Sequence, residues 1–99
     1  MKSFEPGQIV MTRDVADLAF KDREFEEYII DCVRRHLSGD WGDIDYLDWN
    51  ENDLSVDGEF RLLSAYKNKV RKDGSHLPVV WVITEADRSS TCVLFPDNY

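Results

Sequence analysis

Residues 79–95 read VVWVITEADRSSTCVLF, and this stretch decides the fold. Its first run, residues 79–85, is rich in the β-branched and aromatic residues that strands prefer. A short and mostly polar connection follows over residues 86–90, and a second apolar run covers residues 91–95. Two such runs joined by a short polar segment are typical of an antiparallel hairpin, in which Asp87 would cap the turn.

Two further strands are expected upstream of this hairpin. In residues 60–67 the alternation would place Leu62 and Tyr66 on one face of a strand. Residues 8–12 form a short apolar run that follows a Pro-Gly turn signal. The predicted fold class is therefore α+β: a small antiparallel sheet of three to four strands, packed against two to three helices. A chain of 99 residues is typical of a single domain, residues 1–99.

Helical periodicity is clearest over residues 23–37. Apolar residues there recur at helical spacing, with glutamates in the first turns and arginines in the last, which matches the helix dipole at both ends. A shorter helix is expected over residues 14–20 with Asp14 as its N-cap. A third would run from a cap at Asp43 or Asp45 to about Ser55, with Leu47 and Leu54 facing inward.

The surplus charge of the chain lies in one segment, residues 36–60, which contains no Lys or Arg. The net charge of −8 belongs to this segment, because the rest of the chain carries 12 acidic and 12 basic residues. Such a field attracts cationic partners and repels phosphate, which argues against direct nucleic-acid binding and favours a basic protein groove. The segment holds eight carboxylates: Asp40, Asp43, Asp45, Asp48, Glu51, Asp53, Asp57 and Glu59.

The three tryptophans have different expected roles. Trp81 lies within an apolar strand, so we predict that it is a core residue. Trp41 lies in a turn, where its ring would pack while its indole N–H donates to a carboxylate. Trp49 stands among acidic residues of the third helix, and either an interface hot spot or a buried anchor fits it.

Metal, cofactor and disulfide chemistry have little support in the sequence, and we predict no cofactor and no metal. An EF-hand loop counted from Asp40 would place Gly42, Ile44 and Tyr46 at ligand positions, which leaves too few side-chain oxygens. His36 is expected in the last turn of a helix, where a cation is favoured. Cys32 and Cys92 lack metal-site spacing, and two separate thiols are favoured over a disulfide.

Three strings of the sequence resemble a known group of proteins: LSGDWGD at residues 37–43, RLLSAY at residues 61–66 and WVITEADRS at residues 81–89. They resemble a family of small acidic proteins encoded largely on plasmids, phages and integrative elements. The resemblance implies a mobile-element context and does not imply an activity. Small acidic proteins of such elements include anti-restriction and anti-CRISPR inhibitors, some of which imitate the charge of DNA.

The function predicted from these observations is that of a non-enzymatic, cytoplasmic anti-defence inhibitor that acts by charge mimicry. Its acidic segment would occupy a basic groove of a host nucleic-acid-binding protein, such as a CRISPR effector or a restriction enzyme. No membrane contact is expected, because the longest apolar run, residues 77–83, is too short to span a bilayer. The predicted partner-binding residues are Asp40, Asp43, Asp45, Asp48, Trp49, Glu51 and Asp53.

Three alternatives stay open at this point. The carboxylates could be a solvated helix face that provides solubility. The protein could be an accessory protein-binding domain without an inhibitory role. It could also be a small metal-dependent hydrolase or nuclease that holds a divalent ion with Asp40, Asp43, Glu85 and Asp87.

Overall fold

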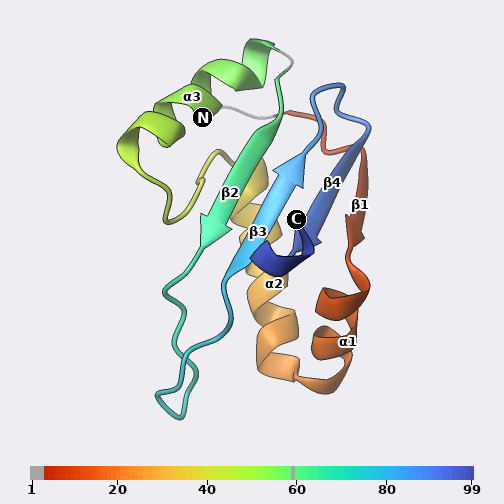
Figure 1. The fold of residues 1–99 in the computed structure, drawn as a ribbon, viewed down its shortest axis with the longest axis vertical. Helices are drawn as coiled ribbons and strands as arrows, with labels where there is room; N and C mark the ends of the chain where they lie inside the picture. The colour runs from red at the N-terminus through yellow and green to blue at the C-terminus, as the bar shows by residue number, and fades with distance from the viewer. Residues whose placement is uncertain (1–3, 59) are drawn as a thin grey trace.

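The structure of the protein, a computed structural model, describes residues 4–58 and 60–99 (Figure 1). Glu59, one of the eight carboxylates of the acidic segment, lies outside the described residues. The predicted α+β class is confirmed. The elements in chain order are β1 (Gln8–Met11), α1 (Arg13–Lys21), α2 (Arg23–Leu37), α3 (Tyr46–Gly58), β2 (Leu62–Tyr66), β3 (Val80–Thr84), β4 (Ser90–Leu94) and the 3₁₀ helix η1 (Pro96–Asn98).

The sheet has the strand order β1-β4-β3-β2. β2, β3 and β4 form the predicted antiparallel meander, in which Ala65 lies opposite Trp81 and Val82 opposite Val93. β1, however, runs parallel to β4, so the prediction of a wholly antiparallel sheet is wrong at this strand. A tight turn fixes the direction of pairing only where it joins two neighbouring strands, and no such turn joins β1 to β4.

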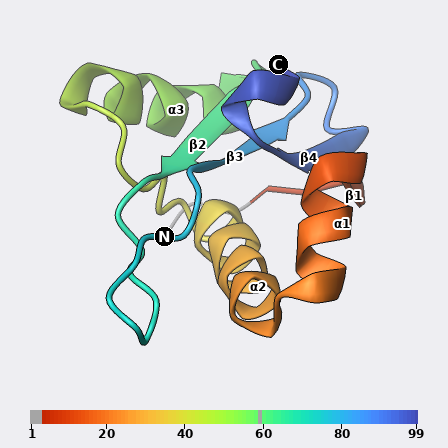
Figure 2. The ribbon, with the colours of Figure 1, turned by 60° about the horizontal axis from the view of Figure 1, so that its bottom comes forward.

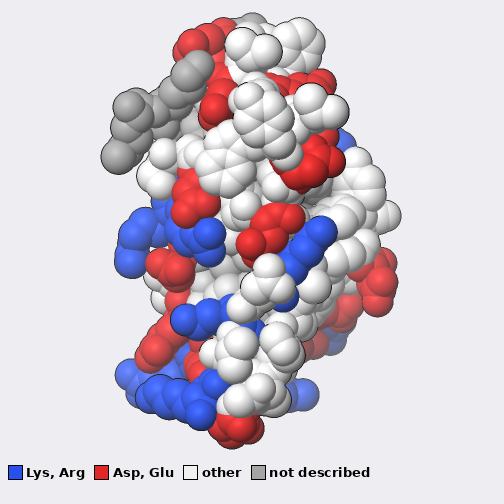
Figure 3. Space-filling view, turned by 90° about the vertical axis from the view of Figure 1, so that its left-hand side faces the viewer, with Lys and Arg blue, Asp and Glu red and all other residues white. Residues whose placement is uncertain are grey.

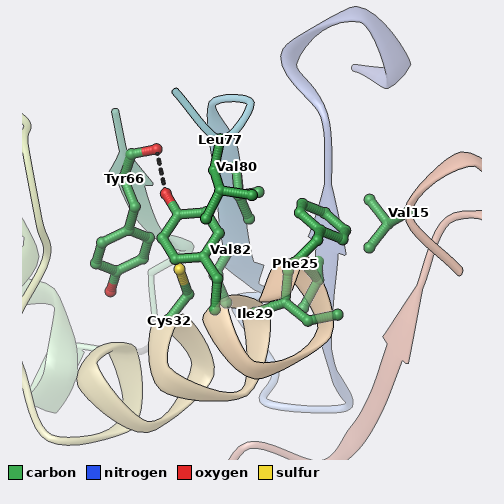
Figure 4. Packing of buried hydrophobic residues seen from close by; sticks show 10 residues of the cluster. Val15, Phe25, Ile29, Cys32, Tyr66, Leu77, Val80 and Val82 are labelled. Atoms are coloured by element: carbon green, nitrogen blue, oxygen red, sulfur yellow. Dashed lines mark hydrogen bonds between the residues drawn. The ribbon is translucent and has the colours of Figure 1, made fainter. Parts of the chain in front are cut away.

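α1 and α2 cover one face of the sheet, whereas α3 and η1 lie on the other side (Figure 2). The apolar stripe of α2 packs on this face: Phe25, Ile29 and Cys32 meet Val80 and Val82 in one buried cluster (Figure 4). The Tyr28 hydroxyl also donates to the backbone oxygen of Tyr66 over 2.9 Å. The predicted bounds of α2 and its inward stripe are therefore confirmed.

The caps of the first two helices follow from local hydrogen bonds. The Asp22 carboxylate accepts from the backbone N–H of Phe25 and caps α2. α1 is capped by Thr12, whose side chain accepts from the N–H of Val15, and not by the predicted Asp14. Thr12 is the better candidate because it is the last extended residue after β1, where an N-cap belongs.

Trp81 lies on the sheet face opposite α1 and α2, so the prediction that it is a core residue is wrong. It is half-buried and packs edge-on against Tyr99, with ring centroids 5.6 Å apart. The period of two in β3 explains this placement, because Val80 and Val82 face the helices and the residue between them must face away.

His36 lies in the last turn of α2, as predicted, but it is fully buried and is not the helix-end cation that this position favours. Its Nδ1 meets the Ser64 hydroxyl, and its Nε2 lies 2.9 Å from the Thr84 hydroxyl. Thr84 in turn contacts Thr91, which donates to the backbone oxygen of Pro6. A carbonyl only accepts, so Thr84 donates to Thr91, Nε2–H donates to Thr84, and Nδ1 accepts from Ser64.

This chain of hydrogen bonds holds His36 in its neutral form. Burial, and secondarily the charge of Arg88, lowers the pKa of His36 to about 3. An unfolded histidine titrates near 6.5, so between about pH 6.5 and pH 3 the unfolded state binds a proton that the folded state does not. Stability from this residue is therefore complete above that window and is lost as the pH falls through it.

We predict that the free energy of unfolding falls by up to about 1.4 kcal/mol per pH unit below pH 6 because of His36. His36→Gln, which retains a donor and an acceptor but does not titrate in this range, should lack this contribution. Urea unfolding of both proteins at pH 7, 6 and 5 measures the difference. Equal slopes for the two proteins would show that His36 does not control the effect.

Candidate protein-binding surface on α3

Residues 41–43 lie along the outer edge of β2 and begin the acidic surface. The Trp41 oxygen accepts from the N–H of Ala65 over 3.2 Å, and the N–H of Asp43 donates to the Ala65 oxygen over 2.6 Å. Gly42 has a φ of 80°, and a Cβ at this position would lie 2.3 Å from the Ala65 oxygen. Only glycine allows this close approach, so Gly42 lets the acidic segment cover the edge of the sheet.

Trp41 ties this segment to α3. Its side chain is fully buried, stacked on Phe4 and edge-on to His36. Its indole N–H donates to the Asp53 carboxylate over 2.9 Å. The prediction that Trp41 packs its ring and bonds a carboxylate is confirmed, and the structure identifies the carboxylate as that of Asp53.

α3 rests on β2 through polar side chains, and its two buried residues are Asn52 and Ser55. The Asn52 amide donates to the Leu63 oxygen over 2.7 Å and accepts from the Leu63 N–H over 3.4 Å. It thereby supplies the hydrogen bonds that a neighbouring strand would otherwise give to this outer strand. The prediction that Leu47 and Leu54 face inward is wrong, because each is 76% exposed.

The two ends of α3 are held by residues of opposite charge. Asp45 accepts from the N–H of Asp48 and is the N-cap, which decides between the two predicted caps. At the other end the Arg88 guanidinium donates to the oxygens of Ser55 over 2.8 Å and Val56 over 3.3 Å. A cation at the carbonyl end of a helix interacts favourably with the helix dipole.

Arg88 positions the end of α3, and sequence reasoning missed this role. It adopts a positive φ of 61° in the turn between β3 and β4, and it also donates to the Phe60 oxygen. The one signal in the sequence was its position in a turn, next to Asp87. Asp87 accepts from the N–H of Ser89, so the predicted turn cap is confirmed. The side chain of Ser89 first, and its N–H second, lower the pKa of the Asp87 carboxyl.

The seven predicted partner-binding residues have unequal roles. Asp40 pairs with Arg35 over 2.7 Å, and this guanidinium holds the pKa of the Asp40 carboxyl below its usual value. Asp43 accepts from the N–H of Lys67 over 2.8 Å. Together with the cap at Asp45 and the Trp41 contact of Asp53, these bonds give four of the seven residues a structural role.

The other three predicted residues are Asp48, Trp49 and Glu51. Trp49 is half-buried, so it is neither fully exposed nor a core anchor. Asp48 and Glu51 are exposed, and within residues 4–58 and 60–99 their carboxylates have no hydrogen bond or ion pair. These two residues are therefore the carboxylates of the seven that are most available to a partner.

A groove of about 470 Å³ runs between α3 and β2, and it combines apolar and acidic groups. Leu54, Phe60 and Leu63 provide its apolar lining, whereas Asp48 and Glu51 lie at its acidic side. Arg61 also lines the groove but is bound to Glu85 over 3.1 Å. Figure 3 shows this side of the molecule: red and white groups are mixed over the upper part, where α3 lies, and blue groups gather below.

The residues of the alternative metal site do not come together. Asp40 and Asp43 lie beside the end of β2 at Ala65–Tyr66, whereas Glu85 and Asp87 follow the opposite end of β3. The described part of the chain holds no group of three or more His, Cys, Asp or Glu that could bind a metal ion. Cys32 and Cys92 are both free thiols, and burial raises the pKa of Cys32 to about 12.

Comparisons of the chain with protein-family models, curated proteins and solved structures found no match. Among the helices of the described residues, none has the length and apolar character needed to cross a membrane.

We predict that Trp41→Phe lowers the free energy of unfolding by about 1–3 kcal/mol, because it removes the bond to a charged group and shrinks a buried ring. The control is Trp81→Phe on the half-covered face, for which a smaller loss is expected. Urea unfolding followed by circular dichroism measures both losses. A larger loss for Trp81→Phe would contradict the anchoring role of Trp41.

Proposed function

We propose that this protein is a non-enzymatic interaction protein that binds a basic partner protein through one side of α3. We call this side the α3 face and define it by Leu47, Glu51 and Leu54, which recur at helical spacing, together with Asp48, which lines the groove with Glu51 and Leu54. The observation that carries the proposal is the orientation of α3, which directs Asn52 and Ser55 to the sheet. It leaves Tyr46, Leu47 and Leu54 in solvent.

The exposed apolar side chains support a surface that becomes covered by a partner. Tyr46, Leu47 and Leu54 are each about three-quarters exposed, and all three belong to one short helix. Apolar groups gathered on a surface and bordered by polar ones mark sites of protein interaction. The adjacent groove offers Leu54, Phe60 and Leu63 as a place for an apolar side chain of the partner.

The charge of the α3 face favours a cationic partner. Asp48 and Glu51 border the groove, and no Lys or Arg occurs in residues 36–60 to neutralise them. Asp43 and Asp45 are also exposed, so they add to the field although each accepts an internal hydrogen bond. Complementary charge speeds association and selects against acidic surfaces.

The setting of this activity comes from the resemblance to acidic proteins of plasmids and phages. In that setting the partner would be a basic nucleic-acid-binding protein of the host, and the protein would act as an anti-CRISPR or anti-restriction inhibitor. The carboxylates would take the place of backbone phosphates. Because apolar groups share the α3 face, binding should weaken with salt but persist in part at high salt.

An accessory domain without an inhibitory role would use the same α3 face. The exposed Leu47 and Leu54 favour this second candidate, because they offer a partner apolar contact that charge imitation does not need. The two candidates differ in their expected salt dependence: charge imitation loses most of its affinity between 50 and about 500 mM salt, whereas apolar contact does not.

We predict that Asp48→Asn combined with Glu51→Gln weakens binding to the basic host partner about tenfold and leaves the fold intact. Neither side chain has an internal partner within the described residues, so the loss is expected to come from contacts with the partner. Asp43 and Asp45 are unsuitable for this test, because their replacement would also remove a backbone contact or a helix cap. Affinity is measured by biolayer interferometry on the partner captured from host lysate.

The matched control is Asp17→Asn combined with Glu26→Gln, which removes two exposed carboxylates from α1 and α2. A change of less than about twofold is expected for this control, since only the long-range field is altered. Equal losses for the two double variants would exclude a specific role of the α3 face.

A further inference from the structure

The sheet has two outer strands, β1 and β2, and their outer edges differ in how they are covered. The edge of β2 is covered by residues 41–43 and by Asn52, as described above. β1 is hydrogen-bonded to β4 on one side, and no strand of residues 4–58 and 60–99 lies on its other side (Figure 1). Its apolar residues are well exposed: Ile9 by 49%, Val10 by 37% and Met11 by 44%.

The backbone of β1 presents unpaired groups at this edge. The N–H groups of Gln8 and Thr12 donate to Ser89 and Val93 of the β4 side, each over 3.0 Å. In a parallel strand alternate residues bond to the same neighbour, so residues 8, 10 and 12 face β4. The N–H and C=O groups of Ile9 and Met11 therefore point to the open edge.

Apart from its short length, the edge of β1 lacks the features that usually prevent strand pairing. Natural outer strands are often very short, or they carry a Lys, a Pro or a bulge that blocks the approach of another strand. β1 has the sequence Gln-Ile-Val-Met, without a charge or a proline, and its pairing with β4 is regular over all four residues. β1 is therefore a template for a further strand.

An apolar groove of about 200 Å³ continues this edge on the helix side of the sheet. Ile9 and Met11 line it together with Ile29, Ile30 and Val33 of α2, and Ile30 is itself exposed. A strand added at β1 would place its own side chains against this groove. Burial of apolar surface would then add to the main-chain hydrogen bonds.

We propose that a second copy of this chain pairs with β1 in the antiparallel direction, about a two-fold axis at Val10. The axis places Ile9 opposite Met11 of the second copy, and Met11 opposite Ile9 of the second copy. Both pairs are hydrogen-bonded pairs, so all four open N–H groups and carbonyls on each side are used. The product is one continuous sheet formed by both copies.

Three features favour a second copy as the occupant. The open edge is self-complementary, because a two-fold axis at Val10 brings the outward N–H and C=O groups of Ile9 in one copy to those of Met11 in the other. The apolar side chains of Ile9 and Met11 meet each other across the seam and oppose no charge. The acidic segment lies beside β2 at the other edge of the sheet, so the two negative fields are kept apart.

The association is expected to depend on concentration. A strand of four residues provides a short seam, whereas stable complexes bury roughly 1,200–2,000 Å² in total. Added salt should favour pairing, because each copy carries a net charge of −8 and screening reduces the repulsion between them. This salt dependence is opposite to that proposed for the α3 face. Because β1 and the α3 face also lie at opposite edges of the sheet, failure of either proposal leaves the other unaffected.

Sedimentation equilibrium from about 10 μM to about 1 mM tests the proposal. The mass of the parent chain should rise from that of one copy toward that of two. Ile9→Lys combined with Met11→Lys places like charges opposite each other and should weaken association at least tenfold. The control Phe20→Lys changes an exposed apolar residue of α1 and should associate like the parent.

A second pair of variants tests the register. Ile9→Lys combined with Met11→Glu would place opposite charges across the same seam and should restore association. Val10→Cys, in a chain that also carries Cys92→Ala, should form a disulfide between two copies under mild oxidation. The two-fold axis brings the Cα atoms of residue 10 to about 4.5 Å, within the range of a disulfide. Cys92 is replaced because it lies beside Val10 within one copy.

Circular dichroism shows whether the lysine variant folds. If it does not fold, the cross-linking of the Val10→Cys variant tests the proposed pairing instead. Its control is Leu54→Cys in the same Cys92→Ala chain, which reports random collisions. A mass of one copy at every concentration would overturn the proposal. It would also be overturned by cross-linking no greater than that of the control, or by a dimer that folded lysine variants leave unchanged.

Discussion

The burial of Trp41 is the constraint on which the acidic half of the molecule depends. Its ring fills a fully enclosed site beside His36, its backbone oxygen bonds to β2, and its indole N–H reaches Asp53 on α3. One residue thus joins the core, the outer strand and the acidic helix. Because Trp41 positions α3 through Asp53, the helix packs beside β2 without an apolar stripe of its own.

This arrangement divides the carboxylates into two groups. Asp40, Asp43, Asp45 and Asp53 hold the segment in place through bonds to Arg35, Lys67, the helix end and Trp41. Asp48 and Glu51 border the groove between α3 and β2, beside the exposed Leu54. A surface that mixes charge and apolar groups fits a protein partner better than phosphate imitation alone, which would not require the leucines.

The same arrangement explains why the edges of the sheet differ. The acidic segment covers β2, since Gly42 approaches Ala65 and the Asn52 amide bonds both backbone groups of Leu63. Among the described residues no segment pairs with the outer side of β1 in this way, and the sequence of β1 contains no charge. One molecule thereby has two separate surfaces: an acidic one beside β2 and an apolar one along β1.

The sequence predicted the parts of the fold that depend on local pattern. The bounds of α2 follow from the spacing of Phe25, Ile29 and Cys32, and the hairpin of β3 and β4 follows from its two apolar runs. The parallel direction of β1 was not predictable, because it depends on contacts between distant segments. Strand alternation places Trp81 and Val82 on opposite faces of the sheet. It does not tell which of the two faces the helices cover.

The candidate site was predicted only in part, and for a related reason. Charge counting located the acidic segment, and Trp41 was correctly expected to bond a carboxylate. Leu47 and Leu54 were placed inward on the assumption that a helix buries its apolar residues. That assumption fails because the edge of β2 requires hydrogen bonds, which Asn52 supplies. Arg88 was missed because three of its five backbone contacts, to Ser55, Val56 and Phe60, lie about 30 residues away in the chain.

α3 is held in place by Trp41, Asn52 and Arg88, and not by an apolar core of its own. Native-state hydrogen exchange tests it most directly, because each amide reports the free energy of its own opening. We expect α3 amides to exchange through a local opening with a lower free energy than the amides of α2, which exchange on global unfolding. Equal protection of both helices, with the same dependence on denaturant, would contradict it.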